Sequence, residues 1–161
     1  MDVRTFGRQF SFAIVMAALY AVLTVGLGPL GYSWIQIRLS EALTPLPFLF
    51  GLPAVIGLTL GCVVANIFSP VGLTDMVFGP LLTLLAAVLA WKFNFGKRLL
   101  ACIYPVVINA FGVSAYLAGI SNVPYAWSVL AVGAGEAISA ILVGYPLLRA
   151  IERVPRMILK E

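Results

Sequence analysis

Three acidic residues stand inside or beside long uncharged stretches of this sequence, namely Glu41, Asp75 and Glu136. A charged side chain within a membrane is costly, so it usually faces a cavity, a counter-charge or a solute. Glu136 is the strongest candidate for ligand contact, because Gly133 and Gly135 flank it and leave room for a ligand. Its structural alternative is a hydrogen bond to a neighbouring helix. Carboxylates placed in this way predict a site for a donor-rich or cationic solute.

Two amides and one basic residue are further candidates for this site. Asn109 falls in the middle of one apolar run and Asn66 near the end of another. Either amide can bind a solute, but Asn109 can equally join two helices and Asn66 can cap a helix. Arg38 and Glu41 are three residues apart, so they can pair on one helical face or act as a ligand clamp. Asp75 also has a structural interpretation, because an acid at a helix start complements the helix dipole.

Aromatic and small residues form two more patterns. The aromatic side chains expected near one membrane surface are Tyr32, Trp34, Phe68, Phe78, Tyr116, Tyr125 and Trp127. They suit an interfacial belt, although Trp34 or Phe78 can also stack on a planar ligand. Ala13, Ala17 and Ala21 recur every fourth residue. Such a stripe lets another helix approach closely, either within this chain or on a partner.

Several kinds of chemistry are excluded or disfavoured. The sequence has no histidine, which excludes histidine triads and histidine metal sites. Cys62 and Cys102 lie far apart without C-x-x-C spacing, which favours buried reduced thiols. No G-x-x-x-x-G-K-[ST] motif occurs, so any ATP would be used by partner subunits. We therefore expect a protein that is not an enzyme and needs no cofactor or metal.

The composition defines the elements that must position these residues. Of the 161 residues, 62% are hydrophobic and 10% are charged, whereas soluble proteins have about 45–50% and about 25%. A soluble domain of this size cannot hide so much apolar surface. The composition excludes a cytosolic enzyme, a nucleic-acid-binding module and a disordered tail. It predicts a single transmembrane domain over residues 1–161.

The uncharged stretches predict an all-α fold with six transmembrane helices. Their expected ranges are 10–28, 37–52, 53–68, 75–91, 99–117 and 127–150. Basic residues near positions 4–8 and 92–98 place both regions in the cytoplasm, so an even number of crossings separates them. The segment between the first and fourth helices therefore crosses twice, with a hinge at Gly51-Leu52-Pro53. Both termini are expected in the cytoplasm of a multi-pass protein of the cell membrane.

The chain resembles a known family at several places. The run from Ile35 to Leu43 (IQIRLSEAL) is similar to the signature of the QueT family of queuosine precursor transporters. Further matching segments are Gly61-Cys62, Ala65-Asn66, Asp75–Gly79, Leu82–Ala87, Tyr104–Ala110 and Gly135–Ala137. The resemblance extends over roughly residues 10–150. Proteins of this family are substrate-binding S-components of energy-coupling factor (ECF) transporters.

The resemblance implies a function and a set of partners. It implies a six-helix S-component with an outward pocket, a transmembrane coupling protein and two cytoplasmic ATPases. The stripe of Ala13, Ala17 and Ala21 is similar to the small-residue motif by which S-components dock on the coupling protein. The implied ligand is a 7-deazaguanine such as preQ1, preQ0 or queuine, and no nucleic acid is expected as a partner.

The same resemblance suggests roles for the candidate residues. Glu136 would accept two parallel hydrogen bonds from the N1–H and the exocyclic amine of the ring. A second acid, Asp75 or Glu41, would meet the ammonium group of preQ1. The other expected contacts are hydrogen bonds from Asn109 or Asn66 and stacking by Trp34 or Phe78. The rival hypothesis is a proton- or ion-coupled secondary carrier that uses Glu136, and a structural membrane subunit is third.

Overall fold

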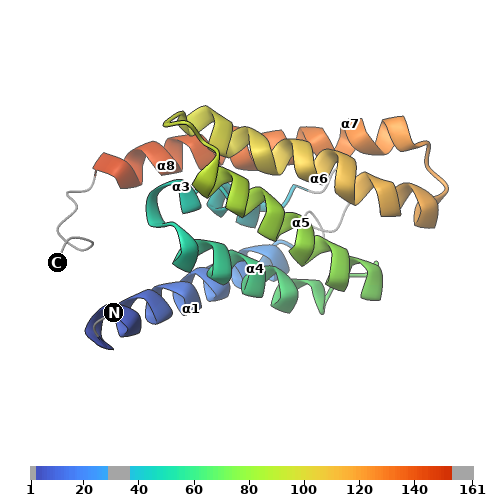
Figure 1. The fold of residues 1–161 in the computed structure, drawn as a ribbon. Coiled ribbons are helices and arrows are strands. Elements are labelled where there is room, and N and C mark those ends of the chain that lie inside the picture. Colours follow the sequence, from blue (N-terminus) through green and yellow to red (C-terminus); the bar gives the residue numbers. More distant parts are fainter. Residues whose placement is uncertain (1–2, 29–36, 154–161) are drawn as a thin grey trace.

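The computed structural model describes residues 3–28 and 37–153, and within these residues all regular secondary structure is helical (Figure 1). The elements are α1 (Val3–Gly26), a 3₁₀ segment η1 (Leu39–Leu43), α3 (Pro47–Phe50), α4 (Leu52–Asn66), α5 (Leu73–Lys92), α6 (Arg98–Ser121), α7 (Tyr125–Glu136), a π-helical segment η2 (Ala137–Val143) and α8 (Gly144–Arg153). The predicted all-α class is confirmed, and α7, η2 and α8 form one continuous helical stretch.

Four helical segments are long and apolar enough to cross a membrane. They are Arg4–Gly26, Leu73–Lys92, Arg98–Ser121 and Tyr125–Arg153. Two shorter apolar segments, Leu39–Phe50 and Leu52–Asn66, occupy the places of the predicted second and third helices. Six full crossings therefore stay a prediction, with four long helices and two short segments in the described residues.

The predicted second helix is broken into tight turns for a chemical reason. Pro45 and Pro47 have no backbone N–H, so they cannot donate the hydrogen bonds of a regular α-helix. The surrounding residues bond at three-residue spacing instead, for example the Leu46 N–H to the Leu43 carbonyl (2.9 Å). Gly51 then turns the chain into α4 with φ 63° and ψ −141°, a conformation that favours glycine. The hinge lies where the sequence predicted it.

The outermost helix, α1, packs closely on α4 through glycines. A Cβ atom added at Gly57 would lie 2.6 Å from the Ala13 carbonyl oxygen, and one at Gly61 would lie 2.6 Å from that of Ala17. Two members of the alanine stripe therefore contact α4 within the chain. The opposite face of α1 is exposed along Ile14, Val15, Ala18 and Val22.

The basic residues gather at one end of the helical bundle. In Figure 1, α1 begins and α8 ends at the left, where the connection between α5 and α6 also lies. The helix ends and the connection at this basic end contain Arg4, Arg8, Lys92, Lys97, Arg98 and Arg153. The α4–α5 and α6–α7 connections at the other end contain no lysine or arginine. The charge asymmetry used for the predicted orientation is thus present in the fold, while the side of the membrane stays a prediction.

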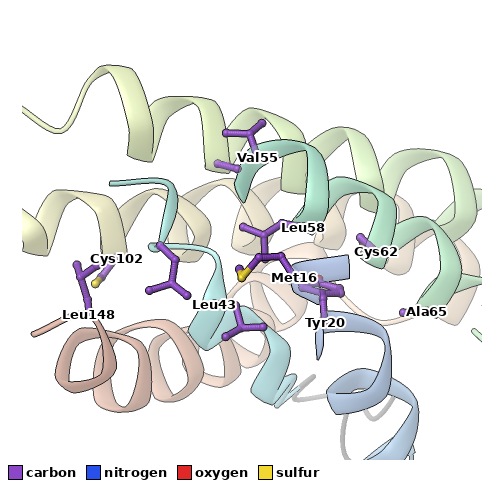
Figure 2. Close-up of a cluster of buried hydrophobic side chains, with 11 residues drawn as sticks. Met16, Tyr20, Leu43, Val55, Leu58, Cys62, Ala65, Cys102 and Leu148 are labelled. Atoms are coloured by element: carbon purple, nitrogen blue, oxygen red, sulfur yellow. The ribbon is translucent and has the colours of Figure 1, made fainter. Parts of the chain in front are cut away.

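A buried apolar cluster holds the helices together around the broken second segment. Met16 and Tyr20 of α1, Leu58 and Cys62 of α4 and Leu43 of η1 point toward one another in Figure 2. Cys102 and Leu148 extend this cluster toward the basic end. The segment η1 packs against α1, η2 and α8, which determines where the polar residues of η1 lie.

Candidate functional site

Among the described residues, four charged side chains are buried. They are Arg38 (4% exposed), Glu41 (1%), Asp75 (0%) and Glu136 (1%). They come from the residue before η1, from η1 itself, from the first turn of α5 and from the last residue of α7. Charged side chains are almost never fully buried unless they are paired. Their partners therefore decide which of them is available to a solute.

Asp75 is fully provided with partners from this chain. Its Oδ2 atom forms an ion pair with Arg38 (3.0 Å) and accepts a hydrogen bond from the Ser69 hydroxyl (2.6 Å). Its Oδ1 atom accepts a hydrogen bond from the Tyr116 hydroxyl (2.6 Å), and its backbone carbonyl accepts one from the Asn66 amide (2.8 Å). The ion pair of Arg38 thus joins η1 to α5. The sequence had suggested Glu41 as the partner of Arg38 on one helical face, whereas the structure pairs it with Asp75.

Glu41 is held by neutral hydroxyl groups. The Tyr20 hydroxyl donates to Oε1, and the Thr44 hydroxyl donates to Oε2 (2.6 Å). One turn further along α1, the Thr24 hydroxyl donates to the Ser40 hydroxyl (2.7 Å). These bonds attach α1 to η1 at two neighbouring positions, so α1 supports the site without contributing a charge to it.

Glu136 differs from the other two acids because its carboxyl group is incompletely bonded. Its buried Oε2 atom has no hydrogen-bond partner among the described residues. The side chain of Asn109 lies beside this carboxyl group, and the charged groups that act on it are Glu41 and Arg38. The adjacent Gly133 faces α6, because an added Cβ would lie 3.3 Å from that of Ala110. The sequence had suggested that Gly133 leaves space for a ligand. In the structure, this glycine instead allows the close approach of α6.

The remaining predicted residues take different places. Asn66 ends α4, and its buried Oδ1 atom has no hydrogen-bond partner among the described residues. Phe78 is half exposed, and its ring stacks on Tyr116 with centroids 6.1 Å apart. Trp34 lies outside the described residues. Cys62 and Cys102 are buried free thiols, as the sequence predicted.

Four hydroxyl-bearing residues of the site were not predicted as site residues from the sequence: Tyr20, Thr44, Ser69 and Tyr116. Tyr116 was assigned to an interfacial belt. Tyr20 gave one usable signal, because it is the one tyrosine in the sequence of α1. The structure buries it completely. Buried tyrosine hydroxyls usually have a hydrogen-bond partner.

The arrangement favours binding of a solute that donates hydrogen bonds. Glu136 contributes one carboxyl oxygen and Asn66 one amide oxygen for which the described residues supply no donor. The acids Glu41 and Asp75 are already bonded. The part of the chain that the structure describes contains no group of three or more His, Cys, Asp or Glu residues suited to a metal ion.

Comparisons with known proteins agree with the resemblance seen in the sequence. A family model described as QueT transporter matches residues 11–153. The matched range contains all four buried charged residues and the residues that bond to them. No curated protein and no solved structure matches the chain.

Proposed function

Because the chain belongs to the QueT transporter family, we propose that it is the substrate-binding S-component of an energy-coupling factor importer. In this proposal it takes up a queuosine precursor, a 7-deazaguanine such as preQ1, preQ0 or queuine. The chain binds the solute from outside and releases it inside after docking on a coupling protein and two ATPases. The chain itself performs no catalysis and uses no cofactor.

The observation that carries this proposal is the buried Oε2 atom of Glu136, to which no described residue donates a hydrogen bond. A buried acceptor without a donor costs free energy, and a solute that supplies donors removes that cost. The N1–H and exocyclic amine of a guanine-like ring give two parallel donors that match one carboxylate. Asn109 lies beside Glu136, and in this proposal its amide bonds the same ring edge. Asp75 already accepts three side-chain donors, so it serves the structure of the site.

The basic end of the bundle gives the proposed orientation, and the exposed face of α1 gives the proposed docking surface. The basic end is assigned to the cytoplasm of the cell membrane by the positive-inside rule. Docking on the coupling protein is assigned to α1, the outermost helix. Ala13 and Ala17 are engaged with α4, and Ala21 is half-buried. The exposed apolar face of α1 is then the part of this helix that is open to a partner.

Calorimetric titration of the detergent-purified chain with preQ1, preQ0, queuine and guanine tests this proposal. We expect a 7-deazaguanine to bind more tightly than guanine, and Glu136→Gln to weaken binding about 10- to 100-fold, because hydrogen bonds to a charged group contribute about 1.5–3 kcal/mol. The matched control is Glu152→Gln, which changes an acid at the basic end that pairs with Arg98. Unchanged affinity in Glu136→Gln would contradict the assigned role.

A second candidate, a proton- or ion-coupled secondary carrier, is favoured by the same carboxyl group. Glu136 is buried and is followed directly by the π-helical segment η2, a kind of helix defect that is frequent at functional sites. Such a carrier would move solute in proteoliposomes that contain this chain alone and a proton gradient. The S-component proposal expects uptake only when the coupling protein and the ATPases are present with ATP.

A further inference from the structure

The turn between α5 and α6, at the basic end of the bundle (Figure 1), places aromatic and basic residues next to one another. It runs from Lys92 to Arg98 (KFNFGKR). Phe93 is 49% exposed and Phe95 is 76% exposed, and the lysines at positions 92 and 97 are exposed as well. A single exposed ring is ordinary on a protein surface. Two exposed rings between two lysines instead form a small amphipathic surface, which we call the aromatic–basic turn.

Hydrogen bonds fix the shape of the aromatic–basic turn. The Asn94 side-chain amide donates to the carbonyl oxygens of Ala90 (2.9 Å) and Trp91 (2.7 Å) in the last turn of α5. The Tyr104 hydroxyl of α6 donates to the Phe93 carbonyl oxygen (2.8 Å). These bonds attach the turn to both helices, so the fold keeps its exposed side chains at one place on the surface.

Phe95 has a backbone conformation that its side chain disfavours. Its φ is 50° and that of Gly96 is 72°, and the Lys97 N–H donates to the Asn94 carbonyl oxygen (2.8 Å) across these two residues. Positive φ at both central residues is typical of a type I′ turn, where glycine, asparagine or aspartate is usual. A bulky residue there is strained, and burial does not offset the strain because Phe95 is exposed. Strain of this kind is found at binding sites, which points to a contact outside the chain.

The aromatic–basic turn lies where a membrane surface is expected. The segments Leu73–Lys92 and Arg98–Ser121 are both long and apolar enough to cross a membrane, and residues 93–97 join them directly. A link this short keeps its side chains near the lipid headgroups, which begin where the hydrocarbon core ends. Phenylalanine rings at this level insert into the boundary between headgroups and acyl chains. The two exposed rings are therefore suited to contact with lipid.

The charges of the turn indicate which kind of lipid it suits. Arg98 is paired with Glu152 (2.6 Å). Among the residues that the structure describes, neither Lys92 nor Lys97 forms an ion pair. The Lys92 ammonium group lies over the Trp91 ring, 4.9 Å from its centroid, which keeps this charge at the end of α5. Lysines at a membrane surface attract anionic headgroups, so the turn is complementary to a phospholipid with a net negative charge.

We propose that the aromatic–basic turn is an anchor for anionic phospholipids. The rings of Phe93 and Phe95 insert beside the ends of the acyl chains, and the ammonium groups of Lys92 and Lys97 bind the headgroup phosphate. This inference goes beyond the proposed function, because it concerns the lipid around the chain and not the solute. Lipid contact supplies the apolar surroundings that the exposed ring at position 95 lacks within the protein.

Binding of two lipids to the chain purified in a non-ionic detergent tests the charge selection. Native mass spectrometry measures apparent dissociation constants for phosphatidylglycerol and for phosphatidylcholine with the same acyl chains. We expect phosphatidylglycerol to bind about 10- to 30-fold more tightly, because each lysine beside an anionic headgroup contributes about 5-fold. The preference should fall to about 2-fold or less in a variant with both Lys92→Gln and Lys97→Gln. A variant with both Arg4→Gln and Arg8→Gln is the matched control, since it removes the same charge from α1 at the same end, and it should keep the preference.

Insertion of the rings is tested in nanodiscs that contain phosphatidylglycerol. A nitroxide label is attached to Phe95→Cys, while Cys62 and Cys102 are buried and are not expected to react. Electron paramagnetic resonance then compares how well the label is reached by oxygen, which concentrates in lipid, and by a water-soluble nickel complex. We expect oxygen to reach the label more readily than the nickel complex does.

Each other result would overturn a stated part of the proposal. Equal affinity of the two lipids for the unmodified chain would show that no anionic lipid is selected, and this comparison does not depend on whether a variant folds. An equal loss of preference in the arginine control would show an effect of net charge and not of the turn. A label at position 95 that the nickel complex reaches more readily would mean that the rings face water or a protein partner.

Discussion

Asp75 and Glu136 are both buried acids, but their surroundings differ. Asp75 lies in a closed network, because Arg38, Ser69 and Tyr116 supply donors to its carboxylate oxygens. Glu136 lies at the end of α7 with one oxygen that no described residue bonds. Burial is nearly the same for both side chains, at 0% and 1% exposed. What separates them is the number of donors that the chain itself provides, and this number indicates which acid has capacity for a solute.

Substitutions of Asp75 and of Glu136 are expected to have different effects on stability and on solute binding. Removal of an acid from a completed network leaves its partners buried without a counterpart, which costs stability. Neutralisation of an acid without a full set of partners removes the free-energy cost of burying that charge. It should therefore lower the affinity for the solute rather than the stability of the fold. Stability and affinity are therefore expected to respond to different substitutions.

The largest effect is expected from Asp75→Ala. It leaves the Arg38 guanidinium buried without its carboxylate, and breaking a buried pair costs about 3–5 kcal/mol. Denaturant unfolding in detergent, followed by circular dichroism, measures this loss. Glu152→Ala is the control, because its ion pair with Arg98 is partly exposed and is expected to contribute at most about 1 kcal/mol. Equal losses in both variants would show that the Asp75 network is not special.

Tyr116→Phe should have the next largest effect. The substitution removes only the hydroxyl that donates to Asp75 Oδ1 (2.6 Å) and keeps the ring that stacks on Phe78. A hydrogen bond to a charged group contributes about 1.5–3 kcal/mol, so the free energy of unfolding should fall by that amount. Tyr125→Phe is the control, because its hydroxyl donates to a backbone carbonyl at an exposed position (3.2 Å). An unchanged unfolding midpoint in Tyr116→Phe would remove this residue from the network.

Gly79→Ala tests the same network by crowding it. A Cβ atom at this position would lie 2.2 Å from Nδ2 of Asn66, whose amide donates to the Asp75 carbonyl. Overpacking of this kind costs about 1–3 kcal/mol. Gly119→Ala in α6 is the matched control, because nothing lies within 4 Å of its added Cβ. If Gly79→Ala and Gly119→Ala have equal free energies of unfolding, the Asn66 side chain moves away from the added methyl group without loss of stability.

Glu136→Gln should have the smallest effect on stability. The substitution removes a charge that lacks a full set of partners, so the free energy of unfolding should change by less than about 1 kcal/mol or should increase. Unfolding measured without ligand isolates this effect from the loss of binding. A loss as large as that of Asp75→Ala would mean that Glu136 has a structural role, and the contrast between the two acids would fail.

Much of the fold follows from the sequence because its signals are local. Uncharged runs locate the helices, and the predicted hinge falls on Gly51, where a positive φ requires a residue without a side chain. The broken segment before it was expected as a helix over residues 37–52, although Pro45 and Pro47 each remove a donor and together prevent a regular helix. The run from Ile35 to Leu43 was sufficient to suggest the family, and the model of that family matches residues 11–153.

The partners within the site could not be predicted in the same way. Hydropathy shows that a helix crosses a membrane, but it does not give the rotation of that helix against its neighbours. Arg38 therefore had a plausible local partner in Glu41, whereas the structure pairs it with Asp75, 37 residues away. The partner of the Tyr20 hydroxyl could not be predicted for the same reason, since Glu41 reaches it only where α1 and η1 meet in the folded chain.

The two hydroxyl bonds between α1 and η1 have a mechanical consequence. Tyr20 and Thr24 are one turn apart on the outermost helix, and they bond to Glu41 and Ser40, which are neighbours in η1. Two attachments side by side act as a clamp rather than a pivot, because neither can rotate without straining the other. Any sliding of α1 along α4 must therefore carry η1 with it or release both bonds together. A force applied to the outside of the bundle is in this way transmitted to an acid at its centre.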